Sequence, residues 1–229
     1  MREFEFELSP SWQATYPGAL AGILVLRDVA NPSQHTGLDQ RKGELENLLR
    51  TQFAGFSRMD LRSLPTLQAY EVYYRRYQKT YHVQLQLESI VLKGKAIPRV
   101  AALVEAMFMA ELQNLLLTAG HDVATLTPPV RLDVANSTEV YTLLNGQEQQ
   151  LKSGDMFMAD QTGVISSILS GPDQRTRISE NTRSAFFAVY APPGIGKDAV
   201  EKHLRDIVAN AQIISPEARV ERLEVLGGG

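Results

Sequence analysis

Cysteine is absent from the 229-residue chain. Its absence excludes disulfide bonds, thiolate metal sites and cysteine nucleophiles, and it fits a reducing compartment. Long apolar runs are also missing, because ALAGILVL at residues 19–26 is far too short to span a bilayer. The N-terminal MREFEFELSPSWQ carries acids where a signal peptide needs basic residues. We therefore predict a cytoplasmic protein without a membrane segment.

The chain also lacks the motifs of several enzyme classes. Its PPGIGKDA segment resembles a phosphate-binding loop, but Ala191 stands where that loop needs glycine and Asp198 where it needs a hydroxyl. No GxSxG elbow of a serine hydrolase is present. The four histidines are spread along the chain without an HExxH pairing. We predict no metal and no cofactor.

The net charge is small. A formal charge of -3 and a pI near 5.9 argue against a protein that coats long stretches of nucleic acid, and we predict no DNA partner. Residues 70–99 nevertheless carry six Lys or Arg against two Glu. A local basic patch that contacts RNA is therefore compatible with the composition.

Five of the eight tyrosines lie in YEVYYRRYQKTY, residues 70–81. Rings interleaved with cations are typical of surfaces that stack bases and track phosphates. Pro65 suits a first helical turn, and helical spacing then places all five rings on one stripe. We predict a helix through this segment with its rings in the core. The cations on the opposite side are the candidate contacts to an RNA backbone: Arg75, Arg76 and Lys79.

Apolar periodicity divides the chain into a helix-rich first half and a strand-rich second half. The first half opens with strands at 4–8 and 22–26 and continues with predicted helices over 39–53, 65–81, 82–94 and 100–120. The second half has predicted strands over 130–134, 139–144, 155–160, 163–169 and 184–191, and a last helix over 198–208. The pattern predicts one α/β (α+β) domain over 1–229, with mixed sheets layered with helices. Its tail over 216–229 is expected to be frayed.

Caps and stops set the expected ends of these helices. Asp39 and Asp198 are predicted N-caps, and Gly94 and Gly120 are predicted C-terminal stops. His121 then follows the end of a long helix, at a junction where a side chain can reach a cleft. A histidine there can orient water or hydrogen-bond a carbonyl, or it can interact with the helix dipole. His121 is the candidate catalytic residue.

The polar loop GPDQRTRISENTR, residues 171–183, lies between two apolar strands. Its arginines can bind a phosphate or carboxylate bidentately, or the loop can simply be solvated. Arg175 and Arg177 are the candidate contacts to the charged end of a substrate, and Thr182 is a further candidate beside them.

The order of these pieces resembles the stand-alone relatives of the B3/B4 domain, the editing module of the bacterial phenylalanyl-tRNA synthetase beta subunit. The likeness covers about residues 15–210, and it implies that these residues form the core of the domain. It rests on YEVYYRRYQKTY, KGKAIP, VAALVEAMF, GHDVATL, LKSGDMFMADQTGVISSIL and TRISENTRSAFFAVYAPPG, in that order. The resemblance implies a mixed α/β domain with layered sheets and helices.

The resemblance also implies site residues. Glu105 and Phe108 occupy the family positions of an aspartate and an asparagine in VAALVEAMF. His121 is the candidate for the histidine that follows in the family, which implies a place near the reacting ester. Phe187 stands at the position of a glutamate that contacts the tyrosine hydroxyl in the synthetase, so we expect a more apolar pocket.

What the family implies about function is recognition of a tRNA acceptor end and, in the synthetase, hydrolysis of tyrosine wrongly attached to tRNA. An aminoacyl ester is already reactive, so a site need only position water and stabilise the oxyanion. Three hypotheses remain: a free-standing aminoacyl-tRNA editing enzyme, a non-catalytic tRNA or RNA binder, and a pocket for an amino acid or similar small molecule. The predicted partner is tRNA or aminoacyl-tRNA.

Overall fold

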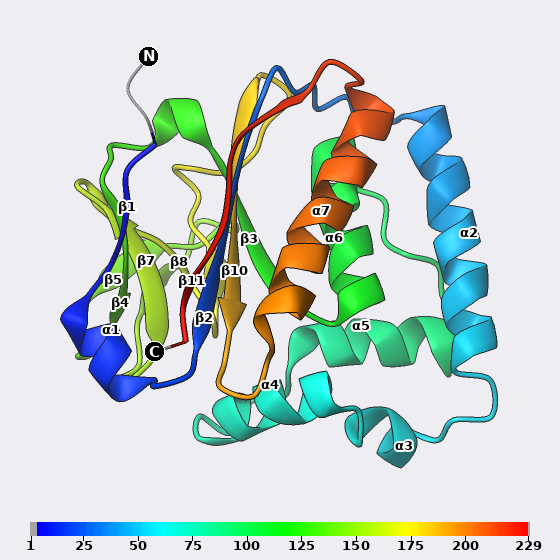
Figure 1. The fold of residues 1–229 in the computed structure, drawn as a ribbon, viewed down its shortest axis with the longest axis horizontal. Helices are drawn as coiled ribbons and strands as arrows, with labels where there is room; N and C mark the ends of the chain where they lie inside the picture. The colour runs from blue at the N-terminus through cyan, green and yellow to red at the C-terminus, as the bar shows by residue number, and fades with distance from the viewer. Residues whose placement is uncertain (1–3, 229) are drawn as a thin grey trace.

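A four-stranded sheet stands between a second sheet and a layer of helices (Figure 1). The computed structural model describes residues 4–228. The central sheet has the order β11-β2-β10-β3, the second sheet the order β1-β4-β7-β8-β9, and β5 pairs with β6 in a hairpin. This arrangement confirms the predicted class of mixed sheets layered with helices.

The first half is rich in helices and the second in strands, as the periodicity predicts. The helices are α1 (Pro10–Thr15), α2 (Thr36–Gln52), α3 (Arg58–Arg62), α4 (Pro65–Arg75), α5 (His82–Val91), α6 (Ala102–Asn114) and α7 (Lys197–Ile214), with a 3-10 turn η1 (Val123–Thr125). The strands are β1 (Phe6–Leu8), β2 (Leu20–Arg27), β3 (Leu117–Asp122), β4 (Val130–Val134), β5 (Val140–Thr142), β6 (Glu148–Gln150), β7 (Met156–Asp160), β8 (Gly163–Ser167), β9 (Gly171–Pro172), β10 (Ser184–Ala191) and β11 (Arg219–Gly227).

The central sheet is covered on both faces. On one face the Phe186 ring lies 4.7 Å from that of Phe4, which precedes the second sheet. On the other face, a Cβ placed on Gly22 would lie 2.7 Å from Val200 of α7, so only glycine allows this helix so close. Strands buried on both faces need apolar side chains throughout, which explains the unbroken runs in β2 and β10.

The predicted long helix over 100–120 is wrong in its second part. Helix α6 ends at Asn114, and Leu115 adopts a left-handed conformation with φ of 60°. Residues 117–122 then form β3, paired with β10, so Gly120 lies within a strand and does not end a helix. All six residues of β3 are buried, and an apolar run buried on both sides has no periodicity that separates strand from helix.

The predicted frayed tail is also wrong. Residues 219–227 form β11, which pairs with β2 along the edge of the central sheet. Residues 221–226 are partly buried, and the strand register shifts between Val220 and Arg222, so the segment lacks the regular alternation that would predict a strand. Gly229 lies outside the described residues.

Helix ends differ from the predicted ones. Helix α2 begins at Thr36 with His35 as its cap, and α7 begins at Lys197 after Gly196, so Asp39 and Asp198 lie in first turns and are not caps. The predicted helix over 65–81 ends at Arg75. Helices α1 and α3 are not predicted, because neither completes two turns and so neither shows a helical repeat of apolar residues.

The tyrosine rings of residues 70–81 are largely buried, as predicted. Tyr70, Tyr73, Tyr74 and Tyr81 are almost completely covered, and Tyr77 is partly covered. Tyr73 donates to Asp155 Oδ1 at 2.7 Å and accepts from the Met156 amide at 2.7 Å, so its hydroxyl joins α4 to the second sheet. These rings are core residues and do not present faces for stacking bases.

Within residues 4–228, no helix combines the length and apolar character needed to cross a bilayer.

Candidate functional site

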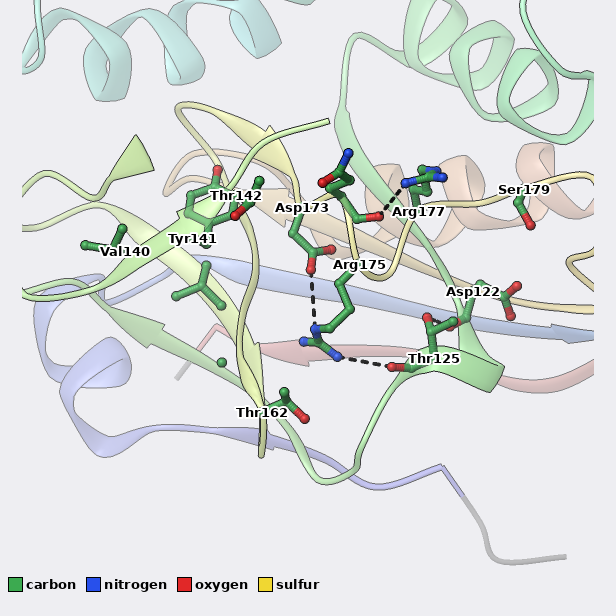
Figure 2. Close-up of a pocket in the computed structure, with 13 residues that line it drawn as sticks. Asp122, Thr125, Val140, Tyr141, Thr142, Thr162, Asp173, Arg175, Arg177 and Ser179 are labelled. Atoms are coloured by element: carbon green, nitrogen blue, oxygen red, sulfur yellow. Dashed lines mark hydrogen bonds and ion pairs between the residues drawn. The ribbon is translucent and has the colours of Figure 1, made fainter. Parts of the chain in front are cut away.

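A polar pocket of about 550 Å³ opens between the β5 strand, the start of β8 and the loop that leads from β9 to β10 (Figure 2). This volume lies within the usual range for small-molecule sites. Hydroxyl groups line much of it: Thr125, Tyr141, Thr142, Thr162 and Ser179. Two arginines, Arg175 and Arg177, two aspartates, Asp122 and Asp173, and Gln174 complete its polar lining.

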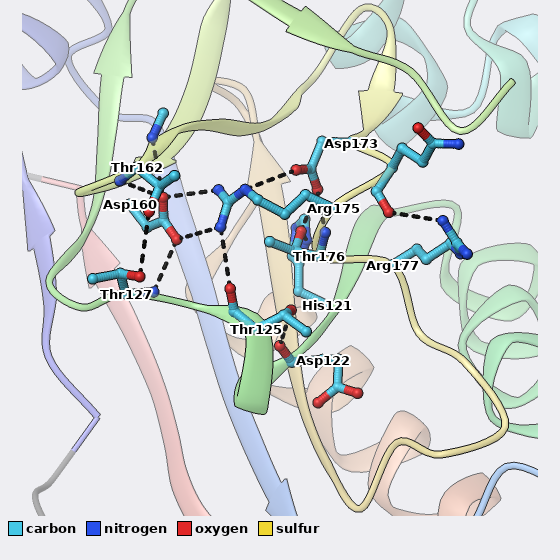
Figure 3. A network of polar contacts seen from close by, with 12 residues as sticks. His121, Asp122, Thr125, Thr127, Asp160, Thr162, Asp173, Arg175, Thr176 and Arg177 are labelled. Atoms are coloured by element: carbon cyan, nitrogen blue, oxygen red, sulfur yellow. Dashed lines mark hydrogen bonds and ion pairs between the residues drawn. The ribbon is translucent and has the colours of Figure 1, made fainter. Parts of the chain in front are cut away.

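The Arg175 side chain is held in place by hydrogen bonds within the protein. Its guanidinium donates to both carboxylate oxygens of Asp160 at 2.9 Å and to the Thr125 carbonyl at 3.1 Å (Figure 3). The Asp160 side chain is fully buried and also accepts from three backbone amides, those of Thr127, Thr162 and Gly163. Burial acts to raise the pKa of Asp160, but these hydrogen bonds outweigh it and hold the pKa below its usual value. The pair therefore fixes the shape of the pocket wall.

Arg177 is exposed like Arg175 but differs from it in having no acidic partner among residues 4–228. It donates to the Gln174 carbonyl at 3.1 Å, and no acidic side chain of residues 4–228 lies within ion-pair distance of it. An exposed guanidinium on the wall of a polar pocket can bind a phosphate or carboxylate with little rearrangement. Both arginines predicted from the 171–183 loop thus line the pocket, but only Arg177 has its charge free.

His121 lies in β3 and is completely buried, so its predicted place beside a cleft is wrong. Its Nδ1 lies 2.7 Å from Thr176 Oγ1, which in turn donates to Asp173 (Figure 3). Because that hydroxyl proton is used on Asp173, the His121 Nδ1–H donates to Thr176, and Nε2 keeps a lone pair without a partner among residues 4–228. Burial, assisted by the charge of Arg175, lowers the pKa of His121 to about 3. The imidazole is therefore neutral.

Asp122 and Thr182 form a second fixed pair at the pocket edge. Thr182 Oγ1 donates to Asp122 Oδ2 at 2.7 Å, and the Ala124 amide donates to Oδ1 at 2.9 Å. Asp122 lines the pocket, whereas Thr182 is buried behind it. Of the two, only the carboxylate can meet a ligand.

The three remaining predicted substrate residues lie away from the pocket. Phe187 pairs with Gly120, and its neighbour Phe186 pairs with His121, so Phe187 and His121 point to opposite faces of the central sheet. The Phe187 ring lies on the α6 side, where a Cβ on Gly120 would meet both it and Met107. Phe187 is fully buried there, so the sheet separates it from His121.

Glu105 and Phe108 lie on α6, the helix that covers this same face. The Glu105 carboxylate is buried and binds Lys42 of α2 at 2.7 Å. Phe108 is partly buried against the core. Neither lines the pocket, so the structure does not bring them together with Arg175 and Arg177.

The three predicted RNA-backbone cations separate in space. Arg75 and Lys79 line a second pocket of about 290 Å³ beside α3. Arg76 does not line it, and its guanidinium lies 5.9 Å from the centre of the Tyr16 ring. Sequence spacing placed the three on one side of a helix. Arg76 keeps helical dihedrals, so its side chain points about 100° away from that of Arg75, and Gln78 with φ of 56° then turns the chain before Lys79.

The hydroxyl lining was not predicted from the sequence. Thr142 and Thr162 come from a strand end and a turn that are far apart in the chain and meet only when the β5 hairpin folds over β8. One indication of this pocket is present in the sequence, the acidic residue Asp122 next to His121. Asp122 lines the pocket, whereas His121 does not.

Comparisons with known proteins support the same fold. The family model of the B3/4 domain matches residues 68–211. The crystal structure of an N-terminal fragment of the phenylalanyl-tRNA synthetase beta-subunit from Pyrococcus horikoshii is similar, with a TM-score of 0.50 and 12% sequence identity. The match covers 96% of this chain and 51% of that one, so the chain spans about half the length of the fragment. No curated protein sequence matches the chain.

Proposed function

Because the chain belongs to the B3/4 domain family, we propose that it binds tRNA and holds the aminoacylated 3′ end in the pocket around Arg177. The family resemblance predicted from sequence order is thereby confirmed, and it makes a synthetase-related role the first hypothesis to test. The observation that carries the proposal is the free guanidinium of Arg177 on the wall of a pocket rich in hydroxyls.

The chemistry of the ligand fits this lining. The end of an aminoacyl-tRNA carries phosphate, ribose hydroxyls, an ester carbonyl and a free amino group. Arg177 suits the phosphate, the threonine and serine hydroxyls suit the ribose and carbonyl, and the Asp122 carboxylate suits the amino group. The fixed Arg175–Asp160 pair presents a formed wall, which lowers the entropy lost on binding.

Replacing Arg177 by alanine is expected to weaken tRNA binding about 10-fold, because one charge-assisted contact is lost, at about 1.4 kcal/mol. The assay measures the affinity for a tRNA that carries an amino acid through a non-hydrolysable 3′-amide. Arg205→Ala is the matched control, since Arg205 lies on α7 and pairs with Glu201. Equal affinities of the wild type and Arg177→Ala would remove Arg177 from the site.

Hydrolysis of the aminoacyl ester is the second candidate function, and the position of Asp122 favours it. This carboxylate lines the pocket and is held by two hydrogen bonds, so it can orient a water molecule toward an ester carbonyl. His121 takes no part in this proposal because it is enclosed between the sheets.

If hydrolysis occurs, Asp122→Asn should slow release of the amino acid by about 100-fold, the scale of a lost acid-base group. The asparagine oxygen can still accept from the Ala124 amide, and its amide can donate to the Thr182 hydroxyl, so the loop should stay folded. Affinity for an unacylated tRNA, which has no amino group for Asp122 to contact, should stay at the wild-type value. Release at the wild-type rate by Asp122→Asn would exclude Asp122. A wild type that binds aminoacyl-tRNA without releasing amino acid would establish the binder and exclude the enzyme.

A further inference from the structure

The second pocket concentrates positive charge on a chain whose net charge is negative. It lies between α3, α4 and the turn that leads into α5, and four cations line it: Arg58, Arg62, Arg75 and Lys79. Glu71 is its one acidic lining residue. Phosphate is the ligand class that such a cluster selects, because several cations can share its charge.

The cations of this pocket are held to different degrees. Arg58 binds Glu88 at 3.0 Å and Arg62 binds Glu71, so both are positioned by acids. Arg75 is exposed, and no acidic side chain in the described part of the chain lies within ion-pair distance of it. The two glutamates neutralise Arg58 and Arg62, but the charge of Arg75 has no acidic partner among residues 4–228. The pocket therefore keeps a net positive charge.

Lys79 closes the pocket toward the second sheet. Its Nζ donates to the Leu169 carbonyl at 3.0 Å, which fixes the ammonium group at the end of the segment that follows β8. Burial, and then the nearby charge of Lys152, lower its pKa. An anion between these cations would relieve that repulsion.

We propose that this pocket binds a phosphate group of the RNA backbone. The proposal rests on the proposed function only in naming RNA as the carrier of the phosphate. The two pockets are linked by β8, since Thr162, Gly163 and Val164 line the first and Leu169 anchors Lys79 in the second. At about 3.3 Å per residue, the five residues of β8 span about 16 Å, and Leu169 follows two residues beyond the strand, a separation that a short length of RNA can bridge.

The test compares two neighbouring arginines. Arg75→Ala should weaken binding of an unacylated tRNA transcript about 5- to 10-fold and reduce the slope of log affinity against log salt by about 0.7 to 0.9, the contribution of one phosphate contact. Arg76→Ala also removes one positive charge, from the next residue in the chain, whose side chain lies outside the pocket. This variant should therefore leave the affinity and the salt slope unchanged. Arg75→Lys should restore most of the slope.

Equal losses in Arg75→Ala and Arg76→Ala would indicate a general charge effect and overturn the pocket. Unchanged binding in Arg75→Ala, with a wild type that binds tRNA, would overturn the inference and leave the proposed function standing. If the wild type does not bind tRNA, the proposed function fails. Titration with pyrophosphate then tests whether the pocket binds phosphate at all. Amide shifts confined to residues 58–62, 71 and 75–84 would then support a site for a small phosphorylated molecule, and their absence would overturn phosphate binding.

Discussion

Arg175→Ala is expected to lower the free energy of unfolding by about 2 to 3 kcal/mol, because it leaves the buried Asp160 carboxylate without its counter-charge. Three backbone amides still donate to Asp160, so the loss should be at the lower end of what breaking a buried ion pair costs. Urea denaturation of the variant and the wild type measures the difference.

Arg177→Ala is the matched control for this measurement. The two arginines lie two residues apart on the same pocket wall, but Arg177 holds no carboxylate, so its removal should change stability by no more than about 0.5 kcal/mol. An Arg175→Ala protein as stable as the wild type would contradict the structural role assigned to that residue. A large loss of stability in Arg177→Ala would contradict its assignment to a ligand.

Glu111→Gln is expected to remove a large pH dependence of stability. The Glu111 side chain is buried on α6 and accepts from the Thr118 amide at 2.7 Å, and burial raises its pKa to about 8. A carboxyl whose folded pKa lies above its ordinary value of 4.5 favours folding fully below pH 4.5 and loses that contribution as the pH rises through 8. The loss is on the order of 3 to 5 kcal/mol.

Glutamine keeps the acceptor oxygen for Thr118 and cannot ionise. The variant should therefore exceed the wild type in stability at pH 9 and lose this advantage at pH 5, as measured by urea denaturation at both values. Asp155 and the buried histidines titrate alike in both proteins, so their effects cancel in the difference. Glu217→Gln is the control, because Glu217 is exposed. If the free energies of unfolding of the wild type and Glu111→Gln changed in parallel with pH, Glu111 would not be the buried carboxyl with a raised pKa.

The elements that the sequence predicts best are those with one exposed face. Periodicity predicts helix α2, and it places the tyrosines of α4 in the core because their spacing puts them on one stripe. Strand β10 has no exposed face and is predicted instead from its continuous apolar run and the polar loop before it. Strand β3 was missed because it is fully buried and begins only three residues after the last residue of α6, with no glycine or proline between them. Strand β11 was missed because its partner β2 lies almost two hundred residues earlier in the chain.

The candidate site was predicted in part. The loop arginines were predicted because their guanidinium groups can bind an anion, and both line the pocket, although Arg175 is paired with Asp160. The joint placement of His121 and Phe187 failed because it depends on the register of β3 against β10, which puts Phe186 and not Phe187 opposite His121. Glu105 was assigned to substrate, but it pairs with Lys42, which lies 63 residues earlier, and sequence spacing does not reveal such a partner.

The central claim is that the pocket around Arg177 holds the aminoacylated 3′ end of a tRNA. Its most direct test is titration of the isotopically labelled protein with adenosine 5′-phosphate that carries an amino acid through a 3′-amide, followed by amide chemical shifts. We expect saturable changes in the amide chemical shifts of the segments that line the pocket, which are 122–125, 140–142, 162–164 and 173–179. Saturable binding that leaves these segments unshifted, or no binding at millimolar ligand, would contradict it.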